Sequence, residues 1–284
     1  MSTASSPTPS RNDAAAARLL LVGCGKMGGA LLQGWLAAGT VSAVEVVDPN
    51  ATRGDGGSVP ADARVILRRS PDEVPAGFQP DALLMAVKPQ MMDAAAPACA
   101  RFVGPGTVVV SIAAGKTIGY FEDRFPGAAV VRAMPNTPAA VGRGMTVCCA
   151  NAAATAAQRA LADRLLSAVG ETAWVEQEDL IDPVTAVSGG GPAYVFLLIE
   201  ALAEAGRKAG LPPDLSMRIA RSTVSGAGEL ARLSPEPASR LRENVTSPGG
   251  TTRAALDVLM APDGIQDLFD RAIAAATRRA GELR

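Results

Sequence analysis

Short runs of apolar and β-branched residues alternate with longer helical stretches through the first 175 residues of the chain. The apolar runs predict strands at 19–23, 44–48, 82–87, 107–112, 129–134, 145–149 and 172–175. Several of these runs lack polar alternation, as is typical of strands that are buried on both faces of a sheet. The stretches between them predict helices, among them 27–38, 90–102 and 155–169. This order predicts an α/β fold with a doubly wound sheet.

The pattern changes at the acidic segment 176–179, beyond which no further strand is predicted. Residues 183–284 read as helices separated by Pro- and Gly-containing turns at 210–213, 234–237, 247–250 and 261–264. Residues 1–17 are rich in Ser, Thr, Pro and Ala, which predicts a disordered tail. We therefore expect a tail at 1–17, a dinucleotide-binding (Rossmann-like) domain at 18–177 and an all-helical domain at 178–284.

One predicted helix, 193–205, is apolar on nearly all of its faces. Such a helix is either buried inside its own domain or covered by a partner subunit, and its sequence is compatible with both.

The composition narrows the classes of partner. The net charge is −1, so no basic surface is expected to bind nucleic acid, and no membrane-spanning stretch is expected. The chain contains no histidine and no C-x-x-C pair, which argues against a metal site and against histidine-dependent nucleophiles. Residues 21–24 resemble a lipoprotein cleavage box, but Asp13 and Arg18 interrupt the apolar stretch before it. We expect a cytoplasmic protein with reduced thiols.

The strongest single motif is G-x-G-x-x-G at 23–28, where a predicted strand meets a predicted helix. In this context Gly23 permits the tight turn, Gly25 lets the main chain approach a pyrophosphate and Gly28 allows close helix packing. The helix that begins near Lys26 and Met27 presents free amides to phosphate. The motif predicts a Rossmann-like site for a dinucleotide.

The choice between NADPH and NADH stays open at the second strand. Asp48 ends that strand, where a carboxylate accepts hydrogen bonds from a ribose hydroxyl and repels a 2′-phosphate, which favours NADH. Asn50 and Arg53 follow it, and a guanidinium there would favour NADPH. Asp48 could also be a solvated turn residue before Pro49.

Further cofactor contacts are expected in the loops that follow later strands, because ligands of such sheets bind outside the carboxyl ends of the strands. These loops contain Ala86, Val87, Lys88 and Pro89, then Ala113, Ala114 and Gly115, and finally Pro135 and Asn136. The small residues at 113–115 would let a flat nicotinamide ring lie against the main chain, or could equally serve tight packing.

Six segments, taken in order, resemble the pyrroline-5-carboxylate reductase family from residue 18 onward. They are G-C-G-K-M-G-G-A, A-V-K-P-Q, V-V-S-I-A-A-G, R-A-M-P-N-T-P, S-G-G-G-P-A-Y at 188–194 and S-P-G-G-T-T at 247–252. The resemblance implies hydride transfer from NADPH or NADH to the C=N bond of 1-pyrroline-5-carboxylate, giving L-proline. It also implies a helical dimerisation domain and therefore a homo-oligomer, at least a dimer.

The resemblance assigns the substrate's carboxylate to the 247–252 turn, with Ser247, Gly249, Gly250 and Thr251 as ligands. It places the hydroxyl of Thr252 near the ring nitrogen, as the candidate catalytic group. A turn at a helix N-terminus does present unpaired amides to an anion, but capping of the helix by Ser or Thr is the alternative reading.

One departure from the family pattern and two alternative functions remain. Many relatives have serine where this chain has Gly190, so a substrate contact from that hydroxyl is in doubt. A β-hydroxyacid dehydrogenase would need a catalytic lysine early in the helical domain, but no lysine lies between Lys116 and Lys208. A non-catalytic dinucleotide-binding regulator would need the first domain but not the 247–252 turn.

Overall fold

The computed structural model describes residues 16–54 and 56–284, and their contacts divide the chain into two compact units. Unit 1 contains the chain up to Ile181 together with Glu282–Arg284, and unit 2 contains Asp182–Gly281. The sequence placed this boundary after residue 177 and placed the last three residues in the helical domain. The predicted tail lies largely outside the described residues, but Ala17 is 3% exposed and is the first residue of a strand.

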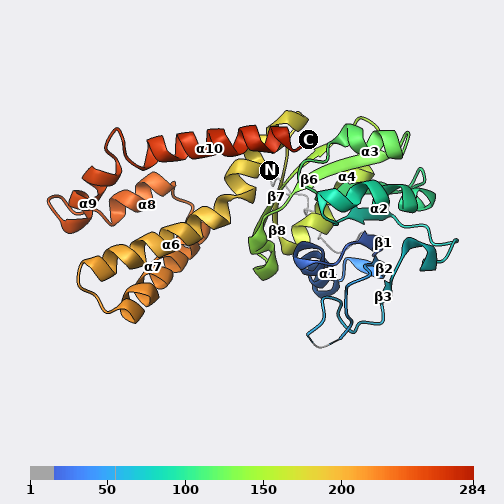
Figure 1. Ribbon diagram of the computed structural model, residues 1–284, viewed down its shortest axis with the longest axis horizontal. Coiled ribbons are helices and arrows are strands. Elements are labelled where there is room, and N and C mark those ends of the chain that lie inside the picture. The colour runs from blue at the N-terminus through green and yellow to red at the C-terminus, as the bar shows by residue number, and fades with distance from the viewer. Residues whose placement is uncertain (1–15, 55) are drawn as a thin grey trace, which may run out of the picture. The chain divides into compact units, whose positions relative to one another are not determined.

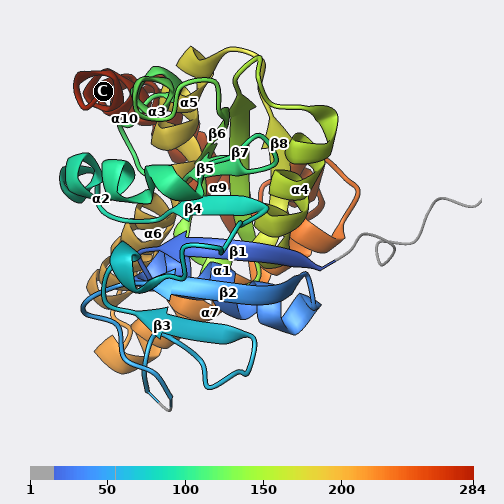
Figure 2. The same cartoon turned by 90° about the vertical axis from the view of Figure 1, so that its right-hand side faces the viewer.

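Unit 1 is built on one eight-stranded sheet with the order β3-β2-β1-β4-β5-β6-β7-β8 (Figures 1 and 2). All neighbouring strands are parallel except β6 and β7, which are antiparallel. The strands are β1 Ala17–Val22, β2 Val41–Val47, β3 Val65–Arg68, β4 Ala82–Met85, β5 Val108–Ser111, β6 Ala129–Met134, β7 Gly144–Ala150 and β8 Gly170–Trp174. The first six follow the strand order of dinucleotide-binding folds, which confirms the predicted fold class.

Helices cover both faces of this sheet because the chain moves in opposite directions from its centre. The β1-to-β2 step runs one way and the β4-to-β5 step runs the other, so right-handed crossovers place their helices on opposite faces. The helices of unit 1 are α1 Lys26–Ala38, α2 Met92–Cys99, α3 Ile118–Arg124 and α4 Ala156–Leu166, with short 3₁₀ turns between them. A capping box formed by Thr155 and Gln158 fixes the start of α4.

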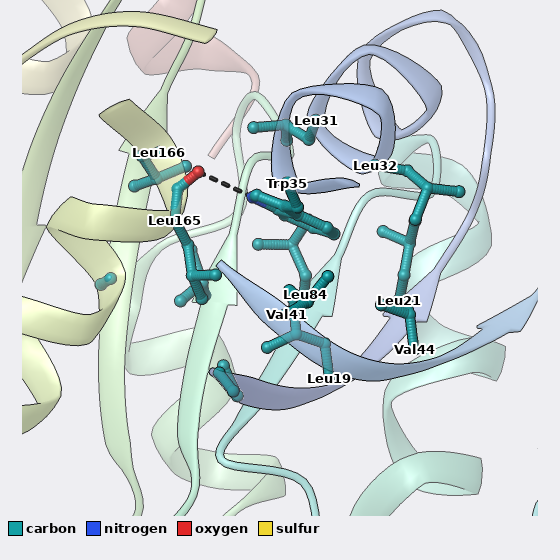
Figure 3. Packing of buried hydrophobic residues seen from close by; sticks show 14 of the residues in the cluster. Leu19, Leu21, Leu31, Leu32, Trp35, Val41, Val44, Leu84, Leu165 and Leu166 are labelled. Carbon is teal, nitrogen blue, oxygen red and sulfur yellow. Dashed lines mark hydrogen bonds between the residues drawn. The ribbon is translucent and has the colours of Figure 1, made fainter. Parts of the chain in front are cut away.

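Trp35 of α1 lies at the centre of the core on one face of the sheet (Figure 3). Its side chain is 0% exposed and packs with leucines and valines of β1, β2, β4 and α4. Its indole Nε1 donates a 2.7 Å hydrogen bond to the Leu165 carbonyl, so the one polar atom of the ring is satisfied. This core holds α1, and with it the glycine turn, against the sheet.

Unit 2 is helical throughout, as the turn pattern predicted. Its elements are α5 Ile181–Val184, which begins at the unit boundary, a π turn at Thr185–Gly189, α6 Gly191–Lys208, α7 Pro213–Leu233, α8 Ala238–Asn244, α9 Thr251–Leu259 and α10 Ile265–Glu282. Helices α6 and α7 pack so closely at Gly206 that a side chain there would collide with the Ser216 hydroxyl. That hydroxyl donates a 2.6 Å hydrogen bond to the Ala203 carbonyl.

Large apolar side chains are exposed along α6, including Val195, Phe196, Leu197 and Leu198. The expectation that no stretch could span a membrane was wrong by length and composition: the helical run Glu178–Lys208 has 31 residues and contains an 18-residue stretch with a mean hydropathy of 1.4, of which 11% is buried. The sequence predicted an apolar helix only at 193–205, whereas in the structure the helical run begins earlier and continues through the π turn. The exposed apolar side chains of this run therefore require apolar surroundings. Its length and hydropathy alone do not identify what provides them.

Candidate functional site

The glycine turn after β1 lies directly against the loop after β4, at the centre of the sheet. Gly23 has a φ of +94°, which favours glycine, and a Cβ there would lie 2.8 Å from the carbonyl carbon and oxygen of Ala86. The turn and the loop are thus in contact at the point where the strand order reverses, which is where dinucleotides bind in such sheets.

The other two glycines of the motif meet different surroundings. A Cβ at Gly28 would collide with the Gly23 carbonyl oxygen, so this position serves close packing of α1 on the turn. A Cβ at Gly25 would meet nothing within 4 Å, and Gly25 is the N-cap of α1 without a side-chain cap. The first amides of α1 therefore border open space, an arrangement that fits a pyrophosphate.

That open space is a pocket of about 630 Å³ in unit 1. Four predicted residues line it: Gly25, Lys26, Asp48 and Asn50. The sequence reading missed one wall, formed by Gly56, Gly57 and Ser58 in the loop between β2 and β3. The glycine-rich run 54–58 was the available signal for it. A side chain at Gly57 would collide with the Thr52 carbonyl, so the wall needs a residue without a Cβ.

Cys24, within the glycine turn, connects the turn to this wall. Its thiol donates a 3.4 Å hydrogen bond to the Ser58 carbonyl. Burial, reinforced by the charge of Asp48, raises the pKa of Cys24 to about 11. The thiol is therefore protonated at neutral pH and packs as a structural group.

The carboxylate of Asp48 is engaged by two main-chain amides. One oxygen accepts a 2.8 Å hydrogen bond from the amide of Cys24, and the other accepts a 2.8 Å bond from the amide of Asn50. Asp48 is partly exposed and lines the pocket. Its negative charge thus stays beside the pocket while the side chain also supports the glycine turn.

The remaining predicted cofactor residues lie in loops at the same edge of the sheet, outside the lining of this pocket. Val87, Lys88 and Pro89 follow β4, with Lys88 exposed. Ala113, Ala114 and Gly115 follow β5, and of these only Ala114 is exposed. Pro135 and Asn136 follow β6, and the Asn136 side chain accepts a 2.9 Å hydrogen bond from the Met145 amide. The glycine turn's Met27 is partly buried against the core.

In unit 2 the predicted substrate turn precedes α9. Gly249 has a φ of +68°, and the amide of Gly250 donates a 3.1 Å hydrogen bond to the Ser247 carbonyl. The N-cap of α9 is Gly250, and among the described residues no side chain caps it. The alternative reading, in which a Ser or Thr hydroxyl caps this helix, was therefore wrong. Thr251 is exposed and Thr252 is half-buried.

The departure at Gly190 has a local cause in Tyr194. A Cβ at Gly190 would lie 2.5 Å from the phenol oxygen of Tyr194, and that phenol donates a 3.0 Å hydrogen bond to the Ala186 carbonyl. The ring also contacts Phe269 edge-on, with ring centroids 6.3 Å apart. Serine at 190 would require Tyr194 to move.

Unit 1 has the strand order and glycine turn of a nicotinamide-dinucleotide oxidoreductase, and unit 2 adds a helical domain with an exposed apolar face. Residues 18–115 match a family model described as NADP oxidoreductase, coenzyme F420-dependent. Residues 178–283 match a second model, described as pyrroline-5-carboxylate reductase dimerisation.

Relatives with full-length matches complete the assignment. The chain is 40% identical to a pyrroline-5-carboxylate reductase of Synechocystis, covering 94% of this chain and 98% of that protein. Among solved structures, a pyrroline-5-carboxylate reductase from Coxiella burnetii has a TM-score of 0.83 at 30% identity, covering 95% of this chain and 99% of that one. A pyrroline carboxylate reductase of Plasmodium falciparum with NADP bound has a TM-score of 0.78 at 28% identity, covering 94% and 98%. The chain belongs to the pyrroline-5-carboxylate reductase family.

Proposed function

We propose that the protein reduces the C=N bond of 1-pyrroline-5-carboxylate with NADPH or NADH, giving L-proline as a step of proline biosynthesis. The observation that carries the proposal is the full-length match to named pyrroline-5-carboxylate reductases, which includes both the dinucleotide unit and the dimerisation domain. When bound, the nicotinamide supplies the hydride that the imine carbon receives.

Unit 1 is proposed to bind the cofactor through main chain at the glycine turn. The open surroundings of Gly25 and the free amides of α1 support a pyrophosphate there. The proposed contacts are Gly23, Gly25, Lys26, Met27, Gly28, Asp48, Asn50, Ala86, Val87, Lys88, Pro89, Ala113, Ala114, Gly115, Pro135 and Asn136. Their place after successive parallel strands supports one continuous binding edge.

Unit 2 is proposed to hold the substrate at the turn before α9. Ser247, Gly249, Gly250 and Thr251 would bind its carboxylate, since the first amides of α9 lack a side-chain cap. Thr252 would orient the imine nitrogen through its hydroxyl. The chain has no histidine, so we propose that the nitrogen takes its proton from solution before reduction. Positioning of the carbon then becomes the main task of the protein.

The protein is further proposed to act as a homo-oligomer, at least a dimer, without nucleic acid or membrane as a partner. A second copy is the proposed cover for the apolar face of α6, because residues 178–283 match a dimerisation domain. The net charge of −1 supports the absence of a nucleic acid partner. Four free, buried cysteines support a reducing, cytoplasmic location.

The test is the reaction itself. Purified full-length protein is mixed with 1-pyrroline-5-carboxylate and either NADPH or NADH, and the loss of reduced-nicotinamide absorbance is followed together with proline formation. We expect stoichiometric turnover with at least one cofactor. Tight nucleotide binding without turnover of either cofactor would reject the proposal in favour of a non-catalytic dinucleotide-binding regulator.

A further inference from the structure

The last residues of the chain pack on the loop that follows β5. Gly115 has a φ of +75°, and a Cβ built on it would collide with the carbonyl oxygen of Leu283. The Leu283 carbonyl carbon and Cβ would lie 3.0 and 3.3 Å from the same point. The space on that side of Gly115 is therefore filled by the chain's own C-terminus, whose residues 282–284 belong to unit 1.

Arg284 fixes this chain end to a second segment of unit 1. Its guanidinium Nη1 donates a 2.7 Å hydrogen bond to the Asp179 carboxylate, although the two residues are 105 positions apart. The Arg284 side chain is 31% exposed and that of Asp179 is 84% exposed. An ion pair this exposed contributes little to stability, so it assists the packing of Leu283 on Gly115 in placing the chain end and does not fix it alone.

Glu178, next to Asp179, contacts the segment that follows the β5 loop. The carboxylate of Glu178 accepts a 2.8 Å hydrogen bond from the amide of Ile118, at the start of α3. The same Glu178 oxygen pairs at 2.9 Å with Arg132, which is 1% exposed within β6. Three segments distant in sequence, 115–118, 178–179 and 283–284, thus form a closed ring of contacts, anchored in the sheet at Arg132.

A separate cluster holds the other side of the loop. The Lys116 ammonium lies 3.9 Å from the Asp93 carboxylate and 4.2 Å from the Tyr120 ring centroid. The Tyr120 hydroxyl donates a 2.7 Å hydrogen bond to Asp93. Burial, and then this bond, raises the pKa of Tyr120 to about 12, which keeps the phenol a donor at neutral pH. Gly115 therefore lies between an anchored Lys116 on one side and the C-terminus on the other.

We propose that Leu283 and Arg284 are positioning residues of the cofactor site: the chain's C-terminus sets the conformation of residues 113–116, on which the nicotinamide end of the cofactor rests. The inference depends on the proposed function for the identity of the cofactor. It gives Gly115, which is proposed above as a cofactor contact, a second role: this position must lack a side chain because Leu283 packs on it. Ala114, the exposed residue of this loop, would then face the cofactor, and the contact of Gly115 with Leu283 would support the loop from behind.

The test is a double-mutant cycle of four proteins. They are the wild type, the Gly115→Ala variant, a truncated chain that ends at Glu282, and the truncated chain that also carries Gly115→Ala. Each is assayed for the dissociation constant of NADPH and NADH without substrate, for kcat and KM with substrate, and for Tm. We expect the shortened chain to bind cofactor about three- to tenfold more weakly with kcat changed less than about twofold, because the loop is displaced but no reacting group is lost.

The two changes are expected to be non-additive. Gly115→Ala in the full-length chain should weaken cofactor binding by about tenfold or more, since the added methyl group forces Leu283 and the loop apart. In the shortened chain the same substitution should cost at least about threefold less, because the colliding carbonyl is gone. Backbone strain from the positive φ of Gly115 costs the same in both chains, so only the difference between them reports the contact with Leu283. Equal cost in both chains would show that this contact does not set the loop and would overturn the proposal. So would wild-type cofactor affinity in the shortened chain.

Arg101→Ala is the matched control. Arg101 is an exposed arginine whose guanidinium donates hydrogen bonds to the carbonyls of Pro71 and Val74. It lies in the segment before β5, at the edge of the sheet opposite the proposed cofactor site. Its loss should lower Tm without changing cofactor affinity. If the wild type fails to reduce 1-pyrroline-5-carboxylate, the proposed function fails, whereas the nucleotide dissociation constants of the four chains still decide the role of the C-terminus.

Discussion

The two units of this protein differ in where their apolar side chains go. In unit 1, Trp35 and the leucines around it are fully buried by the unit's own sheet and helices. In unit 2, Phe196 is 60% exposed, Phe269 is 41% exposed, and none of the side chains of α8, α9 or α10 is buried. Unit 1 has a core of its own, whereas unit 2 does not bury its own apolar face.

The two units therefore gain their stability from apolar surface that is buried in different places. Burial of apolar surface within unit 1 makes its stability a property of the single chain. Exposed apolar side chains of unit 2 gain the same stabilisation only against another surface, which we propose is a second subunit because residues 178–283 match a dimerisation domain. Core substitutions should therefore act on folding in unit 1 and on assembly in unit 2.

The largest expected effect is the loss of the central side chain of unit 1. Trp35→Ala should reduce the free energy of unfolding by about 3–5 kcal/mol, because it leaves a cavity in a closed core. Urea denaturation measured at several protein concentrations provides the value for the unit 1 transition. Trp35→Phe is the control, which retains most of the packing but loses the bond to Leu165. A loss below about 1 kcal/mol for Trp35→Ala would contradict the closed core.

Gly25→Val tests function in the same unit without disturbing its core. The substitution places a side chain in the open pocket, so nucleotide affinity should fall by at least about 100-fold, or about 2.7 kcal/mol, while Tm stays within a few degrees of the wild type. Titration with NADPH and NADH measures the affinity. Gly77→Val, at another glycine with nothing within 4 Å, is the control and should bind normally. Unchanged affinity in Gly25→Val would refute the pyrophosphate site.

Phe196→Asp tests whether the exposed apolar face of α6 in unit 2 takes part in assembly. A buried charge in the subunit interface should weaken association by about 2 kcal/mol or more, about 30-fold, while unit 1 retains nucleotide binding. Sedimentation at a series of concentrations gives the dissociation constant. Ile66→Asp is matched to it: Ile66 is 44% exposed on β3 of unit 1 and should leave assembly unchanged. Equal assembly of both variants would show that α6 is not part of the interface.

Thr252→Ala probes the site of unit 2 rather than its apolar face. The hydroxyl does not cap α9, so its removal should lower kcat/KM by about tenfold, or about 1.4 kcal/mol, with little change in Tm. Steady-state kinetics with varied 1-pyrroline-5-carboxylate provides the measurement. Thr252→Ser retains the hydroxyl and should recover most of the activity. A large fall in Tm with normal kinetics would assign the residue to stability alone.

Much of unit 1 could be predicted from sequence because its signals are local. Short runs of apolar and β-branched residues marked seven of the eight strands, and the glycine spacing after β1 marked the turn. Strand β3, Val65–Arg68, was missed because arginines flank its three apolar residues, whereas β4 and β5, which are equally short, are almost entirely apolar. Helix α3 was missed because it has only seven residues.

Contacts between distant segments could not be predicted in this way. The pocket wall at Gly56–Ser58 depends on how the loop after β2 folds back on Cys24. The pattern of apolar and polar residues does not predict such a contact. The return of Leu283 to Gly115 is likewise set by tertiary packing. Glu178 was read only as the end of the sheet pattern, whereas its carboxylate joins the start of α3 to Arg132.

Asp48→Asn has the smallest expected effect and sharpens the comparison within the cofactor pocket. Removing a negative charge beside the ribose should raise the NADPH-to-NADH ratio of kcat/KM by about fivefold, since two unit charges about 4 Å apart in water interact by about 1 kcal/mol. Asparagine has only one oxygen, so it also loses one of the bonds from the Cys24 and Asn50 amides, and affinity for both cofactors should fall together. The ratio isolates the charge from this shared loss. Asp81→Asn is the control, because Asp81 also accepts a main-chain amide, from Arg18, but precedes β4 at the opposite edge. An unchanged ratio in Asp48→Asn would restrict Asp48 to supporting the glycine turn.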